Sequence, residues 1–100
     1  MKYRLALLAF QVVGVSLTFA QYKPKDGLVP DADTAIKIAV AVWSPIYGAN
    51  HIAGEKPYHA TLKEGVWIVE GSLPEGYNGG VARAEIAKED GKILLVSHGK

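Results

Sequence analysis

The stretch KPYHATLKEGVWIVEGSLP, residues 56–74, decides the fold class. After Pro57 the residue pattern takes the two-residue period of a β-strand. The pattern predicts a strand over 58–62, a tight turn at Lys63-Glu64-Gly65, and a longer strand over 66–73 that ends at Pro74. Because so short a connection joins neighbouring strands, we expect the two to pair antiparallel.

Two further strands follow a loop at residues 74–80 that is rich in turn-forming residues. Residues 81–87 alternate, with Ala82, Ala84 and Ile86 on one face, and residues 93–97 form the last strand. Asp90-Gly91 between them is a hairpin signal, because this pair tolerates positive φ angles. The C-terminal half therefore predicts a meander of four antiparallel strands.

A helix precedes the strands. Asp31 and Asp33 are suitable N-caps, and from Thr34 the apolar residues take helical spacing until Gly48, a typical C-terminal stop. Pro45 predicts a kink or an early end, because proline removes one helical hydrogen bond. The predicted core stripe contains Ile36, Val40, Trp43 and Tyr47, and we expect Trp43, Trp67 or both to pack between helix and sheet. The fold class is thus α+β, with one N-terminal helix packed on a curved four-strand antiparallel sheet.

The predicted elements carry more apolar surface than one helix and one sheet face can bury. The helix has a second stripe, and the strands over 66–73 and 93–97 are apolar on both faces, whereas a sheet of this size normally has one polar face. The lead-in segment, a second copy in a homodimer, or another protein would cover the remaining surface. This surplus points to binding rather than catalysis. The second stripe consists of Ala35, Ile38, Val42 and Ile46.

The N-terminus has the features of a secretory signal peptide. Lys2 and Arg4 precede an apolar stretch over 5–17, which is short for a membrane span, and Thr18-Phe19-Ala20 places small residues before a cut. We therefore divide the chain into a signal peptide at 1–20, a polar lead-in segment at 21–30 and one domain at 31–100. The mature protein is expected in the periplasm or secreted, with no membrane segment.

Composition limits the possible functions of a 100-residue chain. Hydrophobic residues are 49% and charged residues 21%, which is typical of a globular domain. Without the predicted signal, nine Lys and Arg face ten Asp and Glu, a net charge of −1 that gives no basic bias toward nucleic acid. Cysteine is absent, which excludes disulfides, thiolate metal sites and cysteine nucleophiles.

No motif for catalysis or for a cofactor stands out. His51 and His59 are eight residues apart, unlike an ordinary zinc pair, so His51, His59 and His98 are expected to be surface or hydrogen-bonded side chains and no metal is expected. Glu70, in mid-strand, would act as a base only if it were desolvated. We expect neither catalytic residues nor a cofactor.

Several segments together resemble one bacterial immunity-protein family, the immunity proteins of polymorphic toxin systems that have the nuclear-transport-factor-two-like fold. The resemblance covers about residues 30–100 and rests on the order of the segments rather than on one motif. They are DTAIKIA at 33–39, PIYG at 45–48, EKPYHATL at 55–62, GVWIV at 65–69, GSLP at 71–74, Gly79-Gly80 and DGKIL at 90–94.

This resemblance implies a cone-like α+β roll and a protein that binds and neutralises a cognate toxin. It carries over no catalytic residues. The chain is short for the full fold, which usually has more helices. An alternative is a periplasmic peptidase inhibitor of the cystatin-like or propeptide-like kind, which would insert the loop at 74–78 into a protease cleft. A third class, an enzyme that uses the cone cavity, would need a desolvated acid–base pair that the sequence does not show.

Partner binding is predicted at the loop after Leu73. Tyr77 is a candidate aromatic anchor, because tyrosine buries a large area and keeps a hydroxyl for hydrogen bonding. The alternative is that Tyr77 folds back over the end of the sheet. The remaining candidates are Glu75 and Asn78 in the same loop, and Glu70, Arg83 and Glu85 as a charged surround on the neighbouring strands.

The signal peptide gives the first testable prediction. Protein recovered from a periplasmic fraction is expected to begin near Gln21, since cleavage follows the small residue Ala20. N-terminal sequencing checks this, and exported protein that still begins at Met1 would contradict it.

Overall fold

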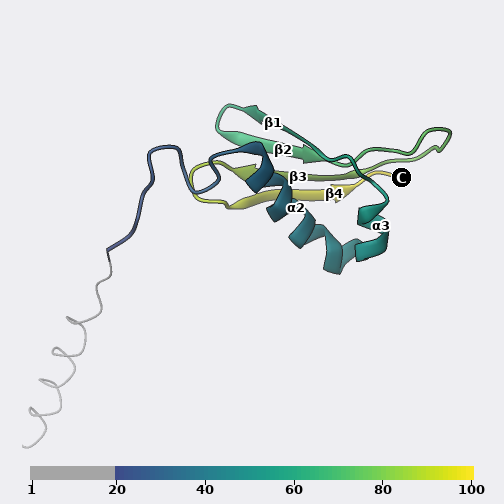
Figure 1. The fold of residues 1–100 in the computed structure, drawn as a ribbon, viewed down its shortest axis with the longest axis horizontal. Helices are drawn as coiled ribbons and strands as arrows, with labels where there is room; N and C mark the ends of the chain where they lie inside the picture. Colours follow the sequence, from purple (N-terminus) through teal and green to yellow (C-terminus); the bar gives the residue numbers. More distant parts are fainter. Residues whose placement is uncertain (1–19) are drawn as a thin grey trace, which may run out of the picture.

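The computed structural model describes residues 20–100, so the predicted signal peptide lies outside the described residues except for Ala20. Two helices, α2 (Ala32–Tyr47) and α3 (Ala49–Ala53), precede four strands. The strands are β1 (His59–Lys63), β2 (Val66–Glu70), β3 (Ala82–Ala87) and β4 (Ile93–His98), in the order β1-β2-β3-β4. All neighbours pair antiparallel, and both helices lie on one side of the sheet (Figure 1). The predicted α+β meander is confirmed.

The main helix begins and ends where its capping residues allow. Asp31 is the N-cap, and its carboxylate accepts a hydrogen bond of 2.8 Å from the backbone N–H of Thr34. This bond is the largest cause of the lowered pKa of Asp31. Gly48 ends α2 with a φ of 98°, and its N–H donates to the carbonyl of Ser44. The helix runs through Pro45 to Tyr47, so of the kink or early end predicted at Pro45 the early end does not occur.

A second helix was missing from the sequence prediction of one helix. α3 has five residues, too few for an apolar period to appear, and only Ile52 among them is buried. The Ile52 carbonyl accepts a hydrogen bond of 2.7 Å from the Tyr58 hydroxyl. The short helix therefore turns the chain from the end of α2 to the start of β1.

The strands depart from their predicted ranges at the ends. β1 begins one residue later and ends at Lys63, and β2 ends at Glu70 rather than at Leu73. The pairing of β1 with β2 stops there because the N–H of Ser72 donates to the backbone carbonyl of Glu55 instead. At the predicted turn between β1 and β2, Glu64 and Gly65 both have positive φ, of 49° and 78°. This is the conformation that a two-residue hairpin requires.

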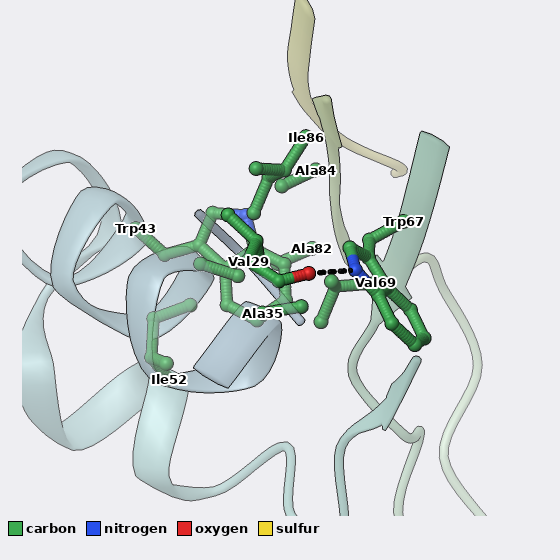
Figure 2. Packing of buried hydrophobic residues seen from close by; sticks show 10 residues of the cluster. Val29, Ala35, Trp43, Ile52, Trp67, Val69, Ala82, Ala84 and Ile86 are labelled. Carbon is green, nitrogen blue, oxygen red and sulfur yellow. Dashed lines mark hydrogen bonds between the residues drawn. The ribbon is translucent and has the colours of Figure 1, made fainter. Parts of the chain in front are cut away.

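The core lies between α2 and the sheet (Figure 2). Trp43 is fully buried and Trp67 is 8% exposed, so the prediction that a tryptophan packs there is confirmed for both. The buried residues of the helix are Ala35, Ala39 and Trp43, so of the predicted core stripe only Trp43 is fully buried, and its other members are partly buried against the core. These two alanines of the helix and two of β3, Ala82 and Ala84, are fully buried, so small side chains fill the core around the two tryptophans.

The lead-in segment contributes to this core. Val29 is 1% exposed, and its carbonyl accepts a hydrogen bond of 2.8 Å from the indole N–H of Trp67 (Figure 2). The N–H groups of Leu28 and Val29 donate to the carbonyls of Glu89 and Lys88 in the β3–β4 hairpin. The segment therefore packs on the helix side and leaves the opposite sheet face uncovered by residues 20–30.

Among residues 20–100, no helix is both long and apolar enough to cross a membrane.

Replacing Trp43 by alanine is expected to lower the free energy of unfolding by about 3–5 kcal/mol, because a large buried side chain leaves a cavity. Ile46 lies on the same helix but is 57% exposed, so Ile46→Ala is the matched control and should change the stability by at most about 0.5 kcal/mol. Chemical denaturation measures both. Equal stability of the two variants would contradict this packing.

Candidate functional site

A hollow opens at one end of the sheet, beside α3 and the loop between β2 and β3. Its volume is about 450 Å³. In Figure 1 the C-terminus, α3 and the base of the loop lie at this same end, and the loop projects beyond the sheet. Residues from all three segments line the hollow: Asn50, His51, Gly54, Glu55, Leu73, Pro74, Tyr77, Asn78, Gly79, Gly80, His98, Gly99 and Lys100.

The buried carboxylate of Glu55 is the central group of this site. Glu55 is 5% exposed and is the one buried charged residue among the described residues. Its Oε1 accepts a hydrogen bond of 2.8 Å from the buried N–H of Ala82, at the start of β3. The backbone of Gly71 lies so close that a side chain at position 71 would overlap Glu55. Packing and hydrogen bonding thus fix the direction of this carboxylate.

Two histidines converge on the other oxygen of Glu55. Oε2 lies 2.8 Å from Nε2 of His98 and 3.1 Å from Nε2 of His51, and the two ring nitrogens are 3.2 Å apart. Nδ1 of His98 lies 2.7 Å from the carbonyl of Gly99. This backbone hydrogen bond, followed by the bond to Glu55, raises the pKa of His98 above its ordinary value.

The arrangement of these side chains follows from the local structure. His51 and Glu55 are four residues apart in and just after α3, a spacing that places two side chains on one side of a helical turn. His98 pairs with Ala82, so it lies on the helix side of the sheet with the buried residues of β3. The ring of Tyr47 lies 5.1 Å from that of His98 between centroids and flanks the cluster.

The sequence prediction missed this cluster because it compared the wrong pair of histidines. His59 is exposed on β1 and takes no part in it. The i,i+4 spacing of His51 and Glu55 was available as a signal, but His98 is 43 residues beyond Glu55. Only the pairing of β4 with β3 brings it back to α3.

The predicted partner-binding residues divide into two groups. Tyr77 and Asn78 line the hollow, and Glu75 is exposed in the same loop. Tyr77 is 69% exposed, so it is not buried against the end of the sheet. The loop group therefore lies next to the histidine cluster.

The second group is on the opposite face of the sheet. Arg83 lies between the buried residues Ala82 and Ala84 and thus points away from α2. Its guanidinium contacts Glu85 at 2.8 Å and Glu70 at 3.4 Å, and the Glu85 contact is the largest cause of its raised pKa. These three residues form a charged strip, and none of them lines the hollow.

Glu55→Ala is expected to lower the free energy of unfolding by about 1–3 kcal/mol, because the buried N–H of Ala82 loses its acceptor. Glu55→Gln keeps an amide oxygen for that N–H and should lose less. Glu75→Ala is the control, since Glu75 is exposed in the loop. Denaturant unfolding distinguishes the three, and a Glu55→Ala variant as stable as Glu75→Ala would show that this hydrogen bond contributes nothing.

Comparison with known proteins gives a family for the chain. The model of a family described as NTF2 fold immunity protein matches residues 34–100. "Uncharacterized protein YhhH" of Escherichia coli (strain K12) is 38% identical over 74 residues, which cover 73% of this chain. The chain spans 58% of the length of that relative. No solved structure matches the chain. The resemblance found in the sequence is confirmed: the chain belongs to the NTF2 fold immunity protein family.

Proposed function

We propose that this chain is an exported immunity protein that binds a cognate bacterial toxin and blocks it by occlusion, without catalysis. The family description supports a role in immunity. The predicted signal peptide supports action outside the cytoplasm, in the periplasm or after secretion. A toxin that acts on the envelope or passes through it would be met there.

The observation that carries the proposal is the exposure of Tyr77 at the end of a defined turn. Gly76 has a φ of 82°, and the N–H of Tyr77 donates to the carbonyl of Pro74 at 3.1 Å. This is a four-residue turn with glycine at its third position, the residue that a type II turn prefers. A turn that already holds the aromatic residue in place lowers the ordering cost of binding.

The surroundings of Tyr77 suit a protein partner. Leu73, at the base of the loop, is 40% exposed and adds apolar area beside the tyrosine. The hollow provides a concave surface next to the two residues. A centre of exposed aromatic and apolar side chains with a polar rim is the arrangement that binding hot spots have. A partner seated here would cover the whole loop end of the domain.

The same projecting loop supports the second candidate, a peptidase inhibitor whose loop enters a protease cleft. Both functions use residues 74–78, but they differ in partner. A cognate toxin is the partner in the first case, which a toxin gene next to this one would favour, and a periplasmic peptidase is the partner in the second. Binding experiments with each separate the two.

Tyr77→Ala is expected to weaken binding to the cognate toxin by about 2 kcal/mol or more, as the loss of an aromatic hot spot does. Tyr22→Ala is the matched control, because Tyr22 is 78% exposed but lies in the lead-in segment. Isothermal titration calorimetry and survival of cells that express the toxin measure the effect.

Three outcomes decide between the interpretations. Loss of binding and protection in Tyr77→Ala but not in Tyr22→Ala supports the loop as the interface. If folded Tyr77→Ala and Arg83→Glu variants both bind normally, the interface lies elsewhere, with the helix stripe around Ile38 and Val42 as the next surface to test. If the wild-type chain neither binds nor protects against the toxin and instead inhibits a periplasmic peptidase, the immunity function is wrong.

A further inference from the structure

We propose that His51, Glu55 and His98 bind one divalent transition-metal ion, of the Zn²⁺ class, beside the hollow. One ligand atom from each side chain lies within 4.8 Å of the other two. The atoms are Nε2 of both histidines and Oε2 of Glu55. This proposal replaces the expectation from the sequence that no metal binds, which rested on the spacing of His51 and His59.

The partners of the remaining polar atoms orient these ligands. Oε1 of Glu55 is occupied by the N–H of Ala82, which leaves Oε2 for the ion. Nδ1 of His98 lies 2.7 Å from the carbonyl of Gly99 and therefore carries a hydrogen. Nε2 of His98 shares a hydrogen with Oε2 of Glu55; when a metal ion replaces that hydrogen, the lone pair of Nε2 binds the ion. Metal-binding histidines commonly donate their second ring nitrogen to a carbonyl or carboxylate in this way.

The distances between the ligand atoms suit a metal ion. They are 2.8, 3.1 and 3.2 Å. With metal–ligand bonds of about 2.0–2.2 Å, ligands at right angles lie about 3 Å apart and tetrahedral ligands about 3.4 Å apart. The triangle is thus close to three neighbouring corners of an octahedron and needs little expansion for a tetrahedron.

The ligand types and the exposure of the site favour a metal ion of intermediate hardness that keeps some coordination positions open to solvent. Two imidazoles and one carboxylate suit Zn²⁺, Fe²⁺ or Co²⁺ better than Mg²⁺ or Ca²⁺, which prefer oxygen ligands. The His51 side chain is 56% exposed and that of Glu55 is 7% exposed. An ion would therefore be held against the buried carboxylate and remain reachable from the hollow, where water or a partner's side chain can complete its coordination.

The experiment titrates ZnCl₂ into the mature chain without an affinity tag, with isothermal titration calorimetry for stoichiometry and a chelator to reverse binding. We expect one Zn²⁺ per chain. His51→Ala and His98→Ala should each weaken binding by about tenfold or more, since even supporting residues of metal sites contribute this much. Because His51 is exposed, its replacement tests the site in a variant that folds even if His98→Ala does not.

His59→Ala is the matched control, because it removes the remaining histidine, which lies outside the cluster, and it should leave binding unchanged. Co²⁺ in place of Zn²⁺ gives a second readout, a visible absorption spectrum that should disappear in His51→Ala. The proposal is wrong if the wild-type chain binds Zn²⁺ no more tightly than the His51→Ala and His98→Ala variants, or if His59→Ala weakens binding equally. All measurements use the chain alone, so the result does not depend on toxin binding.

Discussion

The buried carboxylate of Glu55 connects parts of the fold that are far apart in the sequence. Glu55 follows α3, and its side chain accepts the first N–H of β3 and contacts His98 at the end of β4. The backbone carbonyl of Glu55 also accepts a hydrogen bond from the N–H of Ser72, just beyond β2. A buried charge is costly unless its oxygens are paired, so the surrounding groups must remain in place for the domain to be stable. The same hydrogen bonds hold the side chain of Glu55 in place in the wall of the hollow.

The α2 helix imposes a second constraint, because it covers only one face of the sheet. Its buried residues are Ala35, Ala39 and Trp43, and they pack with Trp67 in a core that lies on that one face. The opposite face keeps Ile68 half-buried beside the charged strip. Three neighbouring residues of β4 at the sheet edge remain well exposed: Ile93, Leu94 and Leu95. Part of the surplus apolar surface seen in the sequence therefore lies on β4, and another part lies on α2, where Ile46 of the predicted second stripe is exposed.

Local patterns were sufficient to predict most of the fold. The cap at Asp31, the stop at Gly48 and the turn at Gly65 each depend on residues within a few positions of one another. Contacts between distant residues were not predictable in this way. Ile52 is buried although α3 is too short to show a period, and the lead-in segment is mostly polar although Val29 enters the core. The histidine cluster is the clearest case, since the last strand supplies one of its three residues.

The two ends of the sheet differ in a way that bears on where a partner binds. At the end with the β1–β2 and β3–β4 turns, the lead-in segment forms backbone hydrogen bonds with residues 88–89, and the N–H of Lys88 donates to the carbonyl of Gly65. Those polar groups are already paired. At the other end, the β2–β3 loop exposes Tyr77 and Leu73 around a hollow whose wall includes the buried, hydrogen-bonded side chain of Glu55. Exposed apolar side chains on a fixed support favour association, because burying them gains free energy while little order must be created. Of the two ends of the sheet, the loop end is therefore the one where the proposed toxin would gain more free energy, and the proposed metal ion at Glu55 would stabilise the same end.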